Sequence, residues 1–218
     1  ALARSQSKLN IIPKEAGEKI TQAAKVDLID WKKLEKRTSI VGYPILPLVE
    51  QLSEKVEGNF GQFCHWGATT QDIMDTADVL QIRKGLELLS KDLKSISDAL
   101  EKIVERHIKT PMAGRTHLQH ALPISFGYKA STWLSGIDRH HKRLEEIKKR
   151  IFNVSFFGAA GTLASLGEDN GLKTQSILAE ELDLNVPDVS WHSIRDNFCE
   201  VTGWLAMVSA SLGKIAYD

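Results

Sequence analysis

The stretch IRKGLELLSKDLKSISDALEKI, residues 82–103, carries apolar side chains at steps that alternate between four and three residues. These apolar positions are Ile82, Leu86, Leu89, Leu93, Ile96, Leu100 and Ile103. The spacing places them along one side of an α-helix and is typical of a helix packed in a bundle. We predict a helix from near Asp72 to near His107, about 50 Å long at ~1.5 Å per residue. Because a helix of that length is too long for a compact two-layer fold, it favours an extended bundle.

Other segments repeat this helical pattern, and no segment shows a long strand-like alternation. Two more long helices are predicted, from Phe126 to Ile151 and from Phe198 to Ile215. Shorter helices are predicted over Glu15–Arg37, Pro44–Val56 and Gly171–Leu182. The apolar side of the first of these would carry Ile20, Leu28 and Trp31.

The predicted fold class is therefore all-α. We expect a small, partial N-terminal helical domain over residues 1–70 and a central long-helix bundle over residues 71–218. The last periodic segment stops at Asp218 without the glycine, proline or polar taper that usually ends a helix. The sequence also starts at Ala1 rather than at a methionine. We therefore expect the chain to be a fragment of a longer subunit.

Composition narrows the class of protein. The 218 residues are 42% hydrophobic, enough for a sizeable core, and their 28 basic and 28 acidic side chains balance. This balance argues against nucleic-acid or membrane-surface binding, and no apolar run approaches the roughly 20 residues of a membrane helix. The two cysteines, Cys64 and Cys199, form neither a disulfide framework nor a metal-ligand spacing. We expect a cytoplasmic protein.

Four polar or glycine-rich connections separate the predicted helices. They are Gly58–Asp72, Thr110–Pro123, Phe157–Gly167 and Pro187–Asp196. Ligand sites in bundles form where connections and helix ends converge, because unpaired backbone N–H groups are available there.

The first connection contains HWGATTQD, residues 65–72. Thr69, Thr70 and Asp72 are each suited to cap the following helix, and His65 is then a buried packing residue. Alternatively, the two threonine hydroxyls and the helix N-terminus bind a substrate carboxylate, since the helix dipole favours anions there.

The second connection contains GRTHLQHALP, residues 114–123. Arg115 can hold a carboxylate with two hydrogen bonds, and His117 can move a proton near neutral pH. A capped interhelical loop with exposed histidines is the alternative, with Pro123 in the first turn of the next helix.

The last two connections add further polar groups. FGAAGTLASLG, residues 157–167, lacks the GxGxxG spacing of a dinucleotide-binding turn. Trp191, His192, Arg195 and Asp196 either form a helix entry or provide a second wall for proton transfer and anion binding. Together the connections hold His, Thr, Gln and Arg without a nucleophilic cysteine or a metal cluster, which favours proton abstraction beside a carboxylate.

Three of these segments resemble the fumarase/aspartase superfamily in their order and spacing. They are HWGATTQDIMDTA (65–77), GRTHLQHALPISFG (114–127) and FGAAGTLASLG (157–167), and the resemblance covers essentially all 218 residues. VGYPILPLVEQL (41–52) and WHSIRD (191–196) are most similar to the bacterial 3-carboxy-cis,cis-muconate cycloisomerase branch, an aromatic-degradation activity. The adenylosuccinate lyase branch is second.

The resemblance implies a helical three-domain subunit that assembles into a homotetramer with active sites shared between subunits. It implies a small polycarboxylate substrate and neither cofactor nor metal. The shared chemistry removes a proton next to a carboxylate and breaks a C–N or C–O bond, or closes a lactone by addition. A non-catalytic helical oligomer is the alternative, because the family's third motif, which carries the catalytic serine, would lie beyond residue 218. Without that motif, we expect the chain alone to be inactive.

Site residues carry over from the family motif by motif. Thr69 and Thr70 match the carboxylate-binding pair, and His65 matches a histidine that contacts substrate in the adenylosuccinate lyases. Thr116 and His117 match the threonine and the proton-transfer histidine of the second motif. Gln119 matches a frequent polar neighbour in the second motif. Arg195 matches an arginine that the branches share in the fourth connection.

The sequence also departs from the family pattern. Tyr43 and Pro44 stand where adenylosuccinate lyases carry a further histidine, and Trp191–His192 replaces a glutamine-type position. Both departures favour the cycloisomerase branch, whereas His117 favours the lyases. Of the two histidines in the second motif, we expect His117 to be catalytic and His120 to pack or cap.

Overall fold

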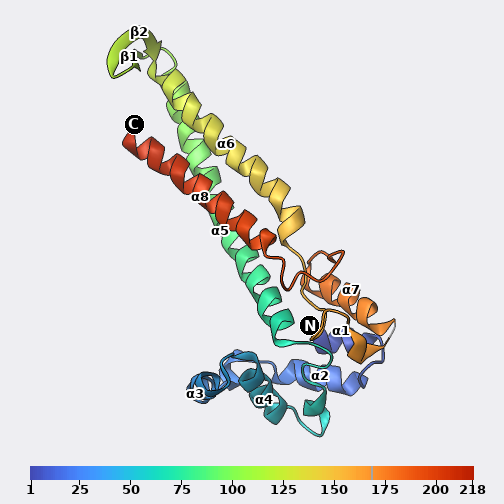
Figure 1. Ribbon diagram of the computed structural model, residues 1–218. Coiled ribbons are helices and arrows are strands. Elements are labelled where there is room, and N and C mark those ends of the chain that lie inside the picture. Colours follow the sequence, from blue (N-terminus) through green and yellow to red (C-terminus); the bar gives the residue numbers. More distant parts are fainter. Residues whose placement is uncertain (168) are drawn as a thin grey trace. The chain divides into compact units, whose positions relative to one another are not determined.

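The computed structural model describes residues 1–167 and 169–218, and it is mostly helical, which confirms the predicted class (Figure 1). The chain divides into two compact units. Unit 1 comprises Ala1–Leu80 and Phe152–Ile194, and unit 2 comprises Gln81–Ile151 and Arg195–Asp218. The predicted boundary between an N-terminal domain ending at residue 70 and a central domain starting at residue 71 stays a prediction.

Unit 1 holds the shorter helices. They are α1 (Leu2–Lys8), α2 (Lys14–Ala23), α3 (Trp31–Val41), α4 (Ile45–Lys55) and α7 (Asn170–Leu182), with short 3-10 turns η1 (Val26–Leu28), η2 (Phe60–Phe63) and η3 (Ala164–Leu166). The first turns of α5 (Thr70–Arg106) also belong to it. The predictions for α4, α5 and α7 are confirmed within two residues at each end.

The helix predicted over Glu15–Arg37 is wrong. The chain leaves α2 at Ala23 and starts α3 at Trp31, because the Asp30 side chain accepts a hydrogen bond from the Lys33 N–H at 3.0 Å and caps a new helix. Ile20 is buried, but Leu28 and Trp31 are 42% and 62% exposed. Their apolar spacing is therefore interrupted by a cap that periodicity alone does not detect.

The centre of unit 1 is an extended segment from Val154 to Phe157, in which no residue is more than 5% exposed. Side chains satisfy its buried carbonyl groups. Gln175 Nε2 donates to the Phe156 carbonyl at 2.9 Å, and Trp191 Nε1 donates to the Val154 carbonyl at 3.1 Å. Because an unpaired buried carbonyl is costly, these bonds fix the segment in one position.

Unit 2 consists of the rest of α5 together with β1 (Pro111–Thr116), β2 (Gln119–Ser125), α6 (Phe126–Ile151) and α8 (Asp196–Tyr217). The helices α6 and α8 pack side by side (Figure 1). Trp204 of α8 is buried and donates its Nε1–H to the His140 carbonyl at 3.0 Å. Both long-helix predictions are confirmed.

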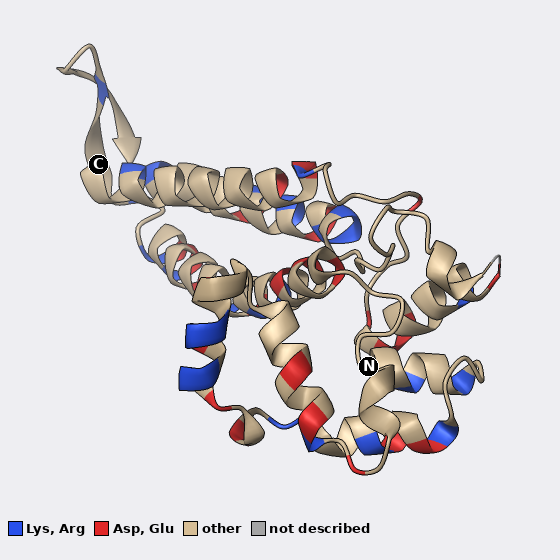
Figure 2. Cartoon of the chain, turned by 60° about the horizontal axis from the view of Figure 1, so that its bottom comes forward, with Lys and Arg blue, Asp and Glu red and all other residues tan. Residues whose placement is uncertain are grey.

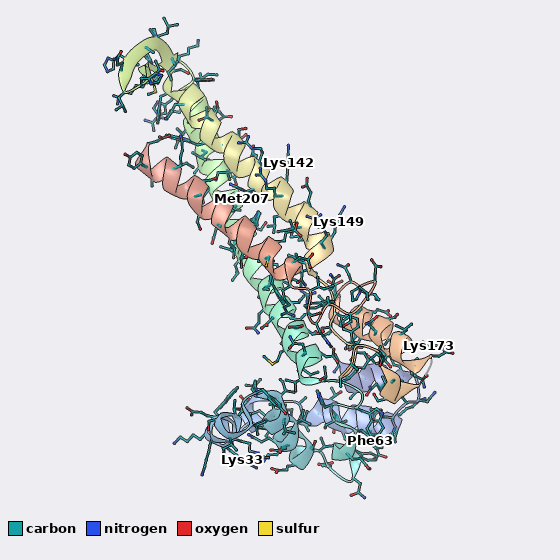
Figure 3. The ribbon with its side chains drawn as sticks, in the orientation of Figure 1. Lys33, Phe63, Lys142, Lys149, Lys173 and Met207 are labelled. Carbon is teal, nitrogen blue, oxygen red and sulfur yellow. The ribbon has the colours of Figure 1, made fainter. Side chains whose placement is uncertain are left out.

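The two sides of α6 differ in exposure to solvent. Lys142 and Lys149 lie on the side of α6 away from α8 (Figure 3) and are exposed. His140 lies on the other side and is buried, with Nε2 2.8 Å from Ser211 Oγ on α8. The Ser211 hydroxyl thus gives the buried Nε2 a hydrogen-bond partner.

The connection between α5 and α6 is an antiparallel β-hairpin, which the sequence did not predict (Figure 1). His117 and Leu118 form its turn with positive φ values of 46° and 61°. Pro123 lies in β2 rather than in the first turn of α6, and His120 is exposed opposite Arg115. The expected packing role of His120 is therefore wrong.

Basic and acidic residues alternate along the helices rather than forming blocks of one sign (Figure 2). Among the described residues, no helix combines the length and hydropathy needed to cross a membrane.

Candidate active site

The site in unit 1 is organised around Asp72, the third residue of α5, which is 1% exposed. Its Oδ2 accepts hydrogen bonds from the backbone N–H groups of Thr69 at 2.9 Å and Gly158 at 3.0 Å. Its Oδ1 accepts from the Phe157 N–H at 2.8 Å and lies 2.7 Å from His192 Nε2. One carboxylate therefore joins three of the four polar connections that the sequence identifies.

The beginning of α5 explains why Asp72 occupies this place. Thr69 precedes the first helical residue, and the side chain of the third residue reaches back to the Thr69 N–H, as in half of a capping box. The helix dipole and the backbone N–H donors offset the negative charge, which a buried carboxylate requires. The Ser155 hydroxyl lies 3.5 Å from Oδ1 and adds a weaker contact.

Among the residues that the structure describes, His192 is the titratable side chain that hydrogen-bonds to Asp72. Its side chain is 20% exposed, so it reaches from the buried carboxylate toward solvent. The Phe157 ring meets the imidazole edge-on, with ring centroids 5.3 Å apart at 87°. The aromatic contact and the hydrogen bond together restrict the orientation of the imidazole.

His65 lies in the first connection, half-buried, with a positive φ of 62°. Such backbone is unfavourable for a residue with a Cβ, and it clusters at functional sites. Burial lowers the pKa of His65 below its ordinary value, and the Asp72 carboxylate opposes this shift. His65 is therefore a neutral imidazole near pH 7.

Two glycines let the first and third connections pack closely together. Gly67 has a φ of 71°, and a Cβ there would lie 2.8 Å from the Leu166 side chain. A Cβ on Gly158, also at positive φ, would lie 3.4 Å from the Gly67 carbonyl oxygen. The structure thus brings together the first, third and fourth connections, with the predicted residues His65, Thr69, Thr70 and His192 in unit 1.

The other predicted site residues belong to unit 2. Arg115, Thr116, His117 and Gln119 all lie on the hairpin and are exposed. Arg115 pairs with His120, and Thr116 pairs with Gln119, across the two strands. His117 lies at the turn of a two-stranded hairpin rather than on an irregular loop.

Arg195 lies at the N-terminal end of α8, also in unit 2. Its guanidinium carbon is 4.6 Å from the centroid of the Phe198 ring, a cation–π contact that holds the side chain against the helix. Among the described residues, no group of three or more His, Cys, Asp or Glu side chains is placed to hold a metal ion.

Sequence reasoning identified Asp72 only as one of three possible caps and missed its central role. Its partners lie 3, 85, 86 and 120 residues away along the chain. The capping-box spacing was the one local signal, and it gives no information on the distant loops.

The family model described as a lyase family matches residues 1–218. The chain belongs to this family, within the fumarase/aspartase superfamily. This confirms the resemblance on which the sequence analysis relied.

Relatives in the lyase family carry several different activities. Trans-aconitate decarboxylase 1 of Mycosarcoma maydis is 44% identical over all of this chain and 44% of its own length. The 3-carboxy-cis,cis-muconate cycloisomerase of Pseudomonas aeruginosa is 40% identical over all of this chain and 48% of its own length. An adenylosuccinate lyase of Methanocaldococcus jannaschii is also 40% identical, over 99% of this chain and 46% of its own length. The chain spans about half the length of the curated relatives it matches.

A solved structure of a fumarate lyase from Mesorhizobium sp. BNC1 matches the fold with a TM-score of 0.96. It is 58% identical, and the match covers 100% of this chain and 51% of that chain. This lyase-family fold is therefore common to a fumarate lyase and to the present chain.

Proposed function

We propose that the protein is a cofactor-independent lyase or cycloisomerase that acts on a small polycarboxylate by proton transfer next to a carboxylate. The observation that carries the proposal is the cluster around Asp72, which joins three polar connections at the N-terminus of α5. The substrates named for the relatives, trans-aconitate, 3-carboxy-cis,cis-muconate and adenylosuccinate, all bear two or more carboxylates.

In this proposal unit 1 binds the substrate carboxylate. Thr69 and Thr70 are half-buried at the start of a 37-residue helix, where N–H groups and the helix dipole favour an anion. His65 and His192 are the imidazoles of the same unit, and both bind substrate. Neutral His65 can donate or accept a hydrogen bond without adding charge.

Unit 2 supplies a proton-transfer group in this proposal. His117 is exposed at the turn of the hairpin, and Thr116, Gln119 and Arg115 follow on the adjoining strand positions. His117 transfers the proton, while Arg115 and Arg195 bind anionic groups of the substrate. We further propose a cytoplasmic homotetramer in which the hairpin of one subunit completes a site in another.

The first reaction to test is the lactonisation of 3-carboxy-cis,cis-muconate, with elimination of fumarate from adenylosuccinate second. Both can be followed by ultraviolet absorbance with the full-length protein, and trans-aconitate is included as a third polycarboxylate. Turnover of one of these compounds supports the proposal and selects the substrate. A folded tetramer that turns over none of them contradicts it.

His117 gives a sharper test, and His120 on the same hairpin is its matched control. His117→Asn lowers kcat by roughly 10²-fold if the imidazole transfers a proton. His120 is exposed like His117. His120→Asn leaves kcat within about two-fold of wild type, as expected of a surface residue. Equal rates in the two variants would remove His117 from the mechanism.

Shared sites in a homotetramer can be tested by mixing inactive variants. His117→Asn and His192→Gln each lack one component of a complete site. If sites are built from different subunits, dissociation and reassociation of the two proteins together restores part of the activity. If each subunit supplies its own complete site, the mixture stays inactive.

A further inference from the structure

The hydrogen bonds of Asp72 fix the direction of its contact with His192. Three of its partners are backbone N–H groups, which can only donate, and both carboxylate oxygens therefore act as acceptors. The remaining close partner, His192 Nε2, lies 2.7 Å from Oδ1. Because a carboxylate in this environment accepts, the imidazole must donate through an Nε2–H.

That donation determines the tautomer of His192. A neutral imidazole carries its proton on one ring nitrogen, so a proton on Nε2 leaves the lone pair on Nδ1. Nδ1 is therefore the nitrogen at which a neutral His192 takes up a proton. When it does so, the resulting imidazolium already has a carboxylate at hydrogen-bond distance.

The surroundings of the pair are rigid. Asp72 is 1% exposed, and both its oxygens are fixed by bonds to the backbone. The Phe157 ring stands edge-on to the imidazole, and Phe157 also supplies one of the N–H bonds to Asp72. A single residue therefore orients both members of the pair. Only the imidazole reaches solvent, since its side chain is 20% exposed and that of Asp72 is 0% exposed.

A purely architectural role for Asp72 would not require a histidine at position 192. The backbone bonds to Thr69, Phe157 and Gly158 already join the first and third connections. Any neutral donor at position 192 would then attach the fourth connection equally well. A titratable, partly exposed donor provides proton exchange in addition to attachment.

We propose that Asp72 is a positioning residue that holds His192 as the Nε2–H tautomer, and that His192 transfers a proton at Nδ1 during the reaction. The role rests on the proposed function, which so far gives His192 only substrate binding. In an elimination, Nδ1 accepts one proton from the carbon next to the carboxylate as the C–N or C–O bond breaks, His117 gives a proton to the leaving group, and both imidazoles exchange with solvent to restore their starting state. In lactonisation, Nδ1 takes one proton from solvent and gives it to that carbon as the carboxylate oxygen adds. Asp72 keeps its charge throughout.

The tautomer is measured directly by long-range ¹H–¹⁵N correlation of the chain labelled at its seven histidines. The signal that disappears in His192→Gln identifies His192. We expect a protonated Nε2 and an unprotonated Nδ1 in the wild-type protein near pH 7.5. In Asp72→Asn, whose amide can donate as well as accept, the His192 tautomer shifts toward a mixture. A wild-type Nδ1–H tautomer, or an unchanged tautomer in Asp72→Asn, overturns the pairing.

The proton-transfer role is tested separately in the full-length protein. His192→Gln keeps a neutral donor for Asp72 but cannot exchange a proton, so kcat falls roughly 10²-fold while KM changes only a few-fold. An unchanged kcat, or a rise in KM alone, overturns this role. If Asp72→Asn fails to fold, the wild-type tautomer and His192→Gln still decide the question.

Thr76→Val is the matched structural control. Thr76 is buried in the same region, and its hydroxyl bonds to the Ser155 backbone without touching Asp72 or His192. If general loosening explains the losses, Thr76→Val reproduces them, and the positioning role is overturned. If it leaves the tautomer and kcat unchanged, the effect belongs to the pair. Absence of any polycarboxylate turnover would refute the proposed function, while the tautomer measurement still tests the pairing.

Discussion

The cluster around Asp72 and the hairpin around His117 present their polar residues in opposite ways. In the cluster, a buried carboxylate is saturated by bonds from residues distant in sequence. In the hairpin, polar side chains are exposed on a local two-stranded support. The cluster is thus pre-organised by the rest of unit 1, whereas the polar side chains of the hairpin are open to solvent. Substitution of the buried Asp72 should therefore cost much stability, whereas substitutions of exposed hairpin residues should cost little.

The largest expected effect is the loss of the Asp72 carboxylate. Asp72→Ala leaves several buried donors without an acceptor and should lower the free energy of unfolding by about 3–5 kcal/mol. Arg115→Ala on the exposed hairpin is the counterpart and should change it by less than about 0.5 kcal/mol. Urea unfolding of both variants measures the difference. Similar values for the two would refute the contrast between the regions.

A smaller effect is expected where the connections pack closely. Gly67→Ala places a Cβ against Leu166 on a backbone with positive φ and should cost about 1–3 kcal/mol. Gly85 on α5 has nothing within 4 Å of a built Cβ. Gly85→Ala should therefore stabilise the protein by about 0.5–1 kcal/mol, because alanine is the better helix former. Thermal and urea unfolding distinguish the signs, and a neutral Gly67→Ala would show that the loops can separate.

Both units should lose stability in mild acid. The pKa values of His65 and His140 are lowered by burial, and the guanidinium groups of Arg143 and Arg139 lower that of His140 further. The unfolded state then binds more protons than the folded state as the pH falls through about 6.5, so the free energy of unfolding decreases. Each histidine contributes at most ~1.4 kcal/mol per pH unit.

Unfolding curves between pH 5 and 8 test this expectation. His65→Gln and His140→Gln should each flatten the dependence, whereas exposed His120→Gln should leave it unchanged. If the pH dependence of the free energy of unfolding persists in His65→Gln and His140→Gln, other titratable groups cause it.

The smallest expected effect is in the hairpin turn. Leu118 is fully exposed and adopts a φ of 61°, which glycine tolerates better than leucine. Leu118→Gly should stabilise the hairpin by about 0.5–1 kcal/mol. Amide hydrogen exchange in β1 and β2 should slow accordingly. Faster exchange would mean that the leucine side chain holds the hairpin through contacts outside it.

Periodicity was enough to predict the long helices, because a buried face repeats every three or four residues whatever its partner. It failed where local hydrogen bonds decide the structure, as at Asp30, whose side chain starts a new helix. It also failed for the hairpin, because two of its turn residues adopt positive φ without being glycine or asparagine.

For the candidate site, the sequence predicted which polar connections contribute residues. It did not predict that Asp72 joins three of them. The polar residue types and the family motifs indicated His65, Thr69, Thr70 and His192, and all four lie in unit 1. The function of Asp72 depends on tertiary contacts with Phe157, Gly158 and His192, which no local pattern encodes. The roles proposed for the hairpin residues rest on family resemblance and await the kinetic tests.

The distance along the chain between Asp72 and His192 has a consequence for synthesis of the protein. Their hydrogen bond joins residues 120 positions apart. At ~5–20 residues per second, a ribosome takes on the order of 10 s to make the intervening chain. During that interval the first turn of α5 carries a carboxylate whose last partner has not yet been made. The candidate site can therefore close only after His192 has been translated, well after the first turn of α5 has been made.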